Sequence, residues 1–270
     1  MLRPDEFARH VALRRVECAD ALSPWVENYW RLRWDLPPRA TFLSATLPHP
    51  SCNLTVEHGG IRHEAEDRVV VTGVVTRRFE VTVRDAGWVF GAKFRPGGLA
   101  ALIGSSAREL RDRTVPAAAL LPEDLVRALD QLGPDVSDED CRDRFDELLK
   151  ELTTAPDPAY DSVLEVVSTM LEDRSLLKVS QVEGRVGIRE RRLQRLFSQY
   201  VGVTPKWVLA RYRMHDVVTE LDDGYDGSLA DLAARYGWYD QAHFTRDFTR
   251  LVGTSPGTYV DACPAGAGGP

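Results

Sequence analysis

Apolar runs long enough to span a membrane are missing from this sequence of 270 residues, since a spanning helix needs about 20. The N-terminal run MLRPDEFARH has no apolar stretch of the kind found in secretory signals. Cysteines are few, and none of the four (Cys18, Cys52, Cys141, Cys263) forms a C-x-x-C pair with another. These absences predict a cytoplasmic chain with no membrane partner, no disulfide framework and no zinc ribbon.

Signatures of common enzyme classes are also missing. The chain has no G-x-S-x-G, H-E-x-x-H, Walker A or Rossmann fingerprint. We therefore expect no enzyme activity, no catalytic residue and no cofactor. The alternative that stays open is a barrel enzyme, either a metal-dependent isomerase or a hydrolase, with a helical appendage.

Histidines and glutamates of the N-terminal part invite a metal-site interpretation. The candidates are His49, Glu57, His58, His63 and Glu64. They lack the His-x-His pair of a metal-binding barrel strand, and the EHGG run that starts at Glu57 is typical of a hairpin turn. We therefore predict solvated loops and no metal site.

Positive charge is concentrated in one block, although the formal net charge of the chain is −7. Residues 1–177 carry 22 basic and 30 acidic side chains, residues 178–215 carry nine and two, and residues 216–260 carry three and eight. Such a block is the electrostatic footprint expected of a protein that binds a phosphate backbone. A solvated helix surface is the plain alternative.

The pattern along the chain predicts an α+β fold with two parts. Residues 1–95 are rich in valine, threonine and aromatic residues, interrupted by proline, glycine and aspartate, which is typical of short strands. Consecutive strands without helices predict a small antiparallel β-barrel or sandwich. The expected strands are Tyr29–Trp34, Thr41–Leu47, Asn53–Glu57, Arg68–Thr72, Phe79–Val83 and Trp88–Phe94, and the helices that follow are Leu99–Ile103, Pro122–Leu132 and Asp138–Leu152.

We place the domain boundaries by composition. Residues 1–153 form the first domain and residues 154–159, which contain two prolines, form the linker. Residues 160–260 are expected to be all-α, and residues 261–270 to be a disordered tail rich in glycine, alanine and proline.

An internal repeat organises the helical part. Leu193–Phe197 matches Phe244–Phe248, and Gly202–Pro205 matches Gly253–Pro256, both at an offset of 51 residues. Each copy predicts a short helix, a glycine turn, a second helix and then Gly-x-[Ser/Thr]-Pro, which is the helix-turn-helix pattern. A linker helix, Pro205–Leu221, joins the two copies and is about 26 Å long at 1.5 Å per residue.

The second helix of each copy is the candidate for reading DNA. Its N-terminal residues would meet base edges in the major groove, where arginine pairs with guanine and glutamine with adenine. The inward-facing positions by helical spacing are Leu193, Leu196, Phe197, Phe244, Phe248 and Leu251. The base-contact candidates are Arg191, Gln194, Arg195, Gln241, His243 and Arg246, and the phosphate-contact candidates are Lys178, Arg189, Arg192, Lys206, Thr245 and Thr249.

The two copies resemble a known family. The run GIRERRLQRLFSQYVGVTP and, fifty residues on, YGWYDQAHFTRDFTRLVGTSPGTY are similar to the double helix-turn-helix domain of AraC/XylS-type bacterial transcription regulators. The resemblance covers about residues 160–260. It implies a sequence-specific DNA-binding transcription regulator with double-stranded operator DNA as its partner. It also implies base-facing roles for Arg191, Gln194, Arg195, Gln241, Ala242 and Arg246.

The first copy departs from the family pattern at two positions. Val182-Glu183 stands where the leading helix usually has Leu-Ala, whereas the second copy keeps Leu232-Ala233. Arg189 stands where the family usually has a serine cap. We expect that Glu183 either points outward or loosens the helix packing of the first copy.

The N-terminal part resembles, less specifically, the barrel modules that precede this domain in some members of the family. The run FGAKFRPGGLAALIG and the Leu-Pro-His-Pro segment before Asn53 carry the similarity. It implies a domain that binds a small-molecule effector or dimerises. RNA polymerase and a second copy of the chain are the further partners that stay open.

Overall fold

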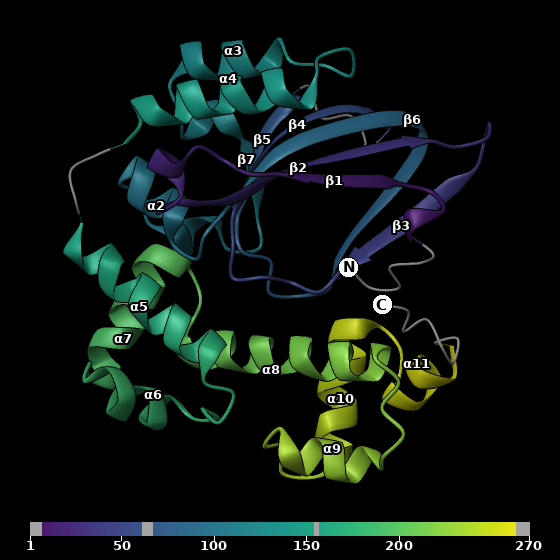
Figure 1. Ribbon diagram of the computed structural model, residues 1–270, viewed down its shortest axis with the longest axis vertical. Coiled ribbons are helices and arrows are strands. Elements are labelled where there is room, and N and C mark those ends of the chain that lie inside the picture. Colours follow the sequence, from purple (N-terminus) through teal and green to yellow (C-terminus); the bar gives the residue numbers. More distant parts are fainter. Residues whose placement is uncertain (1–6, 61–66, 154–156, 263–270) are drawn as a thin grey trace.

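A seven-stranded antiparallel sheet forms the N-terminal part of the computed structural model, which describes residues 7–60, 67–153 and 157–262 (Figure 1). Its strand order is β1-β2-β6-β4-β5-β7, and β3 pairs with the first half of β6. The strands are β1 (Ala12–Val16), β2 (Val26–Asp35), β3 (Thr41–Thr46), β4 (Asn53–Gly60), β5 (Val69–Thr72), β6 (Phe79–Phe94) and β7 (Thr114–Pro116).

The predicted antiparallel β-domain with following helices is confirmed, but its sheet is open and does not close into a barrel. The edge strands β1 and β7 each have a single partner, β2 and β5 respectively, within the described residues. Two strands that we predicted as separate are the halves of β6: its first half pairs with β3, and its second half lies between β2 and β4. Gly87, between the two halves, leaves room for the ring of Trp34, which a side chain at this position would overlap.

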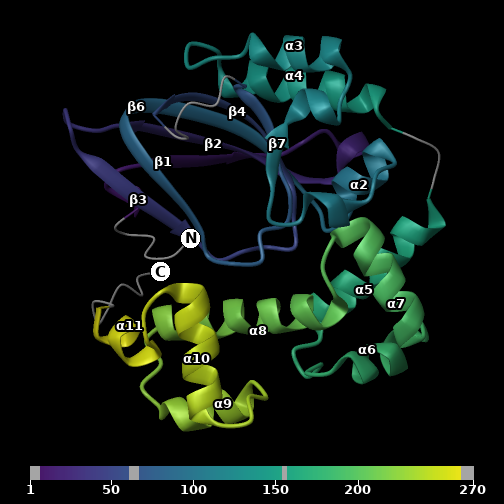
Figure 2. The same cartoon turned by 180° about the vertical axis from the view of Figure 1, so that it is seen from behind.

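Helices supply the core that a closed barrel would have supplied from its own strands. α3 (Glu123–Asp130) and α4 (Asp138–Glu151) cover one side of the sheet in both views (Figures 1 and 2). Phe145 of α4 packs on Tyr29 and Phe90 with ring centroids 5.5 and 5.3 Å apart. The buried Asp146 accepts hydrogen bonds from the Tyr29 hydroxyl at 2.8 Å and from the Ala19 N–H at 3.1 Å.

Two helix-turn-helix units follow, as the repeat predicted. The helices of this part are α5 (Pro158–Glu172), α6 (Val179–Val186), α7 (Glu190–Leu196), α8 (Pro205–Asp222), α9 (Leu229–Arg235), α10 (Gln241–Val252) and α11 (Pro256–Ala262). α7 continues as a π-helical turn, η4 (Phe197–Val201), and α8 connects the two units (Figure 1). Because α11 reaches Ala262, the first two residues of the expected tail are helical; residues 263–270 lie outside the described chain. Among the described residues, no helix has the length and apolar character required to cross a bilayer.

Side-chain caps begin three of these helices. Thr204 accepts from the Trp207 N–H at the start of α8, Ser228 accepts from Asp231 at the start of α9, and Asp240 accepts from His243 at the start of α10. Each cap satisfies a backbone donor that has no partner within its own helix. These boundaries therefore depend on local chemistry alone.

The helical part is docked on the sheet domain at equivalent points of the two repeats. Gly202 and Gly253 end the two recognition helices, with φ of +83° and +88°. A Cβ at position 202 would lie 2.6 Å from the carbonyl oxygen of Ala107, in η2 (Ala107–Leu110), and a Cβ at position 253 would overlap the guanidinium of Arg78. Both repeats thus bring a glycine against the N-terminal domain.

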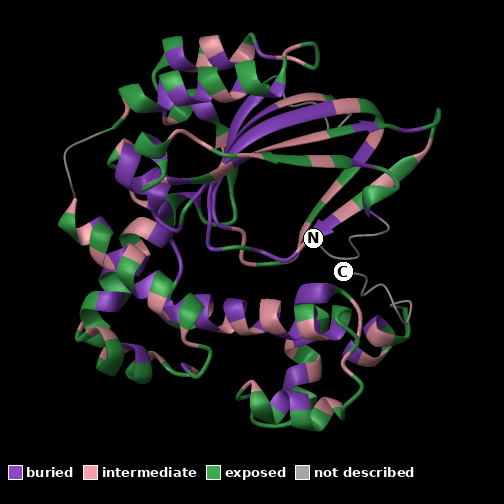
Figure 3. Ribbon diagram, viewed as in Figure 1, coloured by how far each residue is buried: buried purple, intermediate pink, exposed green. Residues whose placement is uncertain are grey.

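Buried side chains of the N-terminal domain and of the helical part pack in common clusters, which strengthens this docking. The buried side chains of the sheet, α3, α4 and the first helix-turn-helix unit form one continuous cluster. Ala45 and Leu47, at the end of β3, pack into the core of the second unit beside Tyr259. Figure 3 shows buried segments on both sides of the junction.

Two histidines meet where α8 contacts the N-terminal domain. The rings of His49 and His215 are 4.2 Å apart between centroids, and the Nε2–H of His215 donates to the Pro48 carbonyl at 3.1 Å. Burial lowers the pKa of His215 to about 4. This ring is therefore neutral at pH 7, and its protonation opposes docking.

Gly202→Ala should destabilise the protein more than Gly187→Ala. Both glycines have a left-handed backbone conformation. A Cβ at Gly187 (φ +70°) would meet nothing within 4 Å, so Gly187→Ala adds only backbone strain of about 1 kcal/mol. At Gly202 the clash with Ala107 is added, and we expect a loss of about 2–3 kcal/mol. Urea unfolding measures both values. Equal losses would show that the contact with Ala107 is not tight.

Acid should lower the free energy of unfolding because it protonates His215. Because the folded pKa lies below the ordinary 6.5, the stabilising contribution is complete above pH 6.5 and is lost as the pH falls towards about 4. This loss amounts to about 3 kcal/mol at 1.36 kcal/mol per pKa unit. His215→Gln keeps a donor for Pro48 without a titrating ring, so its free energy of unfolding should fall less between pH 7 and pH 4. An unchanged pH profile would contradict this assignment.

Candidate nucleic-acid interface

The first unit presents the polar side of α7 to solvent. Leu193, Leu196 and Phe197 are 0%, 6% and 0% exposed, so the predicted inward positions are confirmed. Arg191, Gln194 and Arg195, the predicted base-contact residues, are all exposed. The Gln194 side-chain amide donates to Glu190 at 3.0 Å. Among the described residues, Arg189, Arg191, Arg192 and Arg195 have no ion-pair partner, which leaves these four cations available for phosphates or bases.

The second unit presents α10 in the same way. Phe244, Phe248 and Leu251 face inward, and Trp238 packs edge-on against Phe244 with a centroid separation of 5.1 Å. The outward positions are Gln241, Ala242, His243 and Arg246, all of them exposed.

His243 is less free than the sequence suggested. Its Nε2 lies 3.3 Å from the carboxylate of Asp247, one turn along the same helix. Asp247 also accepts hydrogen bonds from the Trp238 indole N–H at 3.1 Å and from Arg250 at 2.9 Å. Among the exposed polar residues of α10, Gln241 and Arg246 are therefore the better placed to reach bases.

The phosphate-contact candidates lie around the two helices. Lys178, Arg189, Arg192, Lys206 and Thr249 are exposed, whereas Thr245 is half-buried. Lys178 begins α6, where its backbone N–H donates to the Gln181 side chain at 2.9 Å, so its ammonium group stays free of the cap.

The two departures in the first unit have structural consequences. Glu183 is half-exposed, whereas the equivalent Ala233 of the second unit is 1% exposed and packed between helices. Arg189 gives α7 no side-chain cap, whereas Asp240 accepts from the His243 N–H at 2.6 Å. The second unit is thus the more firmly built of the two.

Two arginines counted in the basic block turn out to be part of the packing. Arg211 is 3% exposed and lies over the ring of Trp207 at 4.8 Å; desolvation lowers its pKa to about 10. Arg213 lies over Trp238 at 5.2 Å and donates to the Tyr236 carbonyl at 3.0 Å, which holds the turn before α10. Charge counting could not separate these inward arginines from those of the surface.

Tyr239 is an exposed aromatic residue of this surface that no sequence pattern marks. This side chain is 93% exposed and immediately precedes Asp240, the cap of α10. A lone tyrosine in the turn of a helix-turn-helix unit gives no periodic signal, so its exposure emerged only from the structure.

The proposed metal candidates are not brought together. His49 stacks on His215, and His58 contacts the Leu132 carbonyl through Nε2 at 2.8 Å. His63 and Glu64 lie outside the described residues. Within residues 7–60, 67–153 and 157–262, no group of three His, Cys, Asp or Glu side chains is arranged to hold a metal ion.

α8 sets the separation of the two units. Its 18 residues span about 27 Å at 1.5 Å per residue. One turn of DNA is about 34 Å, so a connector of this length permits two recognition helices to enter successive major-groove segments on one face. Figures 1 and 2 show the units at opposite ends of α8.

Family models match both parts of the chain. A model described as a helix-turn-helix domain matches residues 184–262, and a domain of unknown function (DUF6597) matches residues 14–116. A probable transcription factor, PqrA from Proteus vulgaris, is 27% identical over 99 residues, which cover 37% of this chain and 80% of PqrA.

Solved structures with a similar arrangement also belong to bacterial regulators. ToxT from Vibrio cholerae covers 95% of this chain and 100% of its own, with 12% identity and a TM-score of 0.43. A regulator with an AraC-type DNA-binding domain from Chromobacterium violaceum covers 40% of this chain and 96% of its own, with 21% identity and a TM-score of 0.36. The family-model match identifies residues 184–262 as a helix-turn-helix domain, and together with the similarity to PqrA it supports a DNA-binding transcription regulator.

Proposed function

We propose that both helix-turn-helix units read bases and that the chain is sequence-specific. The supporting observation is that α7 and α10 each bury one apolar face and leave arginine and glutamine exposed near their N-termini. Arg191, Gln194 and Arg195 would read one major-groove segment, and Gln241 and Arg246 the next. The exposed cations around them, Lys178, Arg189, Arg192 and Lys206, would bind phosphates and supply affinity.

We propose in addition that a small-molecule effector regulates DNA binding through the junction between the two parts. A cleft of about 880 Å³ lies there, lined by Glu27, His49 and Lys93 on one side and by Tyr212 and His215 of α8 on the other. A ligand in this cleft would contact the sheet domain and the connector at once. It would shift DNA binding if it bound one arrangement of the two parts more tightly than the other.

The cellular compartment follows from the DNA target. We infer that the chain acts in the cytoplasm, where bacterial DNA is accessible. RNA polymerase and a second copy of the chain remain predictions from the sequence.

Arg195→Ala should weaken binding to the preferred DNA by about 1–3 kcal/mol and relax the preference at one base position. Arg192→Ala is the matched control, because Arg192 is an exposed arginine of the same helix with an expected phosphate role. It should weaken binding to all sequences alike and lower the salt slope by about one. A uniform loss for Arg195→Ala would make Arg195 a phosphate contact instead.

A thermal-denaturation screen of metabolites tests the effector proposal. A ligand of the cleft should raise the melting temperature of the native chain and leave that of Ser168→Trp unchanged, because Ser168 lines the cleft and tryptophan would fill it. Ser162→Trp, on the same helix but away from the cleft lining, should respond like the native chain. No response to a broad library would favour a purely dimerising or structural N-terminal domain.

A further inference from the structure

Three exposed arginines of the N-terminal domain lie beside the first helix-turn-helix unit. They are Arg108, within η2, and Arg111 and Arg113, just after it. Arg113 donates to the Glu109 backbone carbonyl at 3.2 Å, and among the described residues none of the three has an ion-pair partner. The carboxylate of Asp112 is turned away to Thr76, from which it accepts the N–H at 2.6 Å and the hydroxyl at 2.8 Å.

The position of these arginines relative to DNA is fixed by a close backbone contact. η2 packs on η4, the C-terminal end of the first recognition helix. A Cβ at Gly202 would lie 2.6 Å from the Ala107 carbonyl oxygen and 3.3 Å from the Arg108 backbone nitrogen. The arginine segment is therefore held against the helix that carries Arg191 and Arg195.

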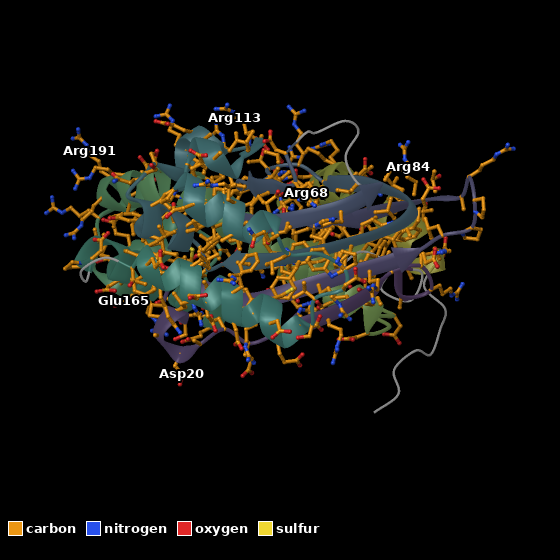
Figure 4. All side chains as sticks on the ribbon, turned by 90° about the horizontal axis from the view of Figure 1, so that it is seen from above. Asp20, Arg68, Arg84, Arg113, Glu165 and Arg191 are labelled. Carbon is orange, nitrogen blue, oxygen red and sulfur yellow. The ribbon has the colours of Figure 1, made fainter. Side chains whose placement is uncertain are left out.

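Arg113 also lies on the side of the molecule from which Arg191 of the first recognition helix projects (Figure 4). In Figure 4, Arg113 and Arg191 project from one side of the molecule, whereas Glu165 and Asp20 lie on the opposite side. The charges of the sequence follow this division. Residues 67–116 carry nine basic and five acidic side chains, whereas residues 117–177, which include α3, α4 and α5, carry five and sixteen.

We propose that Arg108, Arg111 and Arg113 bind phosphates of the DNA backbone that flanks the segment read by α7. This inference rests on the proposed function of α7. The 12 residues of α7 and η4 span about 18 Å, more than the roughly 12 Å width of a major groove. The C-terminal end of the helix thus lies at the bordering strand, where η2 adds its cations. The N-terminal domain is then part of the DNA interface, and its contacts add affinity without base preference.

The test compares two triple variants of the full chain on DNA selected by the native protein. R108A/R111A/R113A should lower the slope of log affinity against log salt by about 2.7, at 0.9 per phosphate contact. Between 50 and 200 mM salt, the native chain should lose roughly 40-fold more affinity than this variant. R127A/R142A/R144A removes three arginines of α3 and α4, on the acidic segment, and should keep the native slope.

Two further measurements make the result decisive. R108K/R111K/R113K should restore the slope, because phosphate binding needs charge, whereas a packing role of the guanidinium groups would not be rescued. Hydroxyl-radical footprints should extend past the first submotif for the native chain and shorten for the alanine variant. A native slope in the alanine variant would overturn this inference alone, whereas absence of any DNA binding by the native chain would overturn the proposed function itself.

Discussion

The contact between the N-terminal domain and the two glycines that end the recognition helices constrains the rest of the molecule. Gly202 meets Ala107 and Gly253 meets Arg78, so one rigid sheet domain touches the same structural position in both repeats. A connector helix alone would let each unit swing about its ends. Docking at two points fixes the spacing and the relative rotation of α7 and α10, which successive major-groove segments require.

The same docking compensates for the small size of each unit. A helix-turn-helix unit of about 50 residues buries too little apolar surface to be robust alone. The first unit therefore shares one core with the sheet, and the second takes Ala45 and Leu47 from β3 into its own. The cleft and the contact between the rings of His49 and His215 both lie in this junction. If Arg108, Arg111 and Arg113 bind phosphates, the sheet domain both positions the reading units and extends their surface.

What the sequence predicted well depends on short-range chemistry. The inward faces of α7 and α10 and the glycine turns of the repeat are set within a few residues. What it missed depends on distant partners. Gly87 of β6 faces Trp34, and Arg213 lies over Trp238, partners that are far away in the sequence and that pattern analysis cannot place beside them. The identity of the base-contact residues remains a prediction, since exposure of Arg195 or Gln241 is compatible with any solvated surface.

Selection from genomic DNA with the purified full chain, at a stated salt concentration, tests the central claim most directly. If the sheet domain holds both units in register, the selected sequences should contain two submotifs at one fixed spacing, about one helical turn apart. A single short submotif would show that only one unit reads bases. Two submotifs at variable spacing would show that the docking at Gly202 and Gly253 does not persist on DNA, and either result would contradict the account.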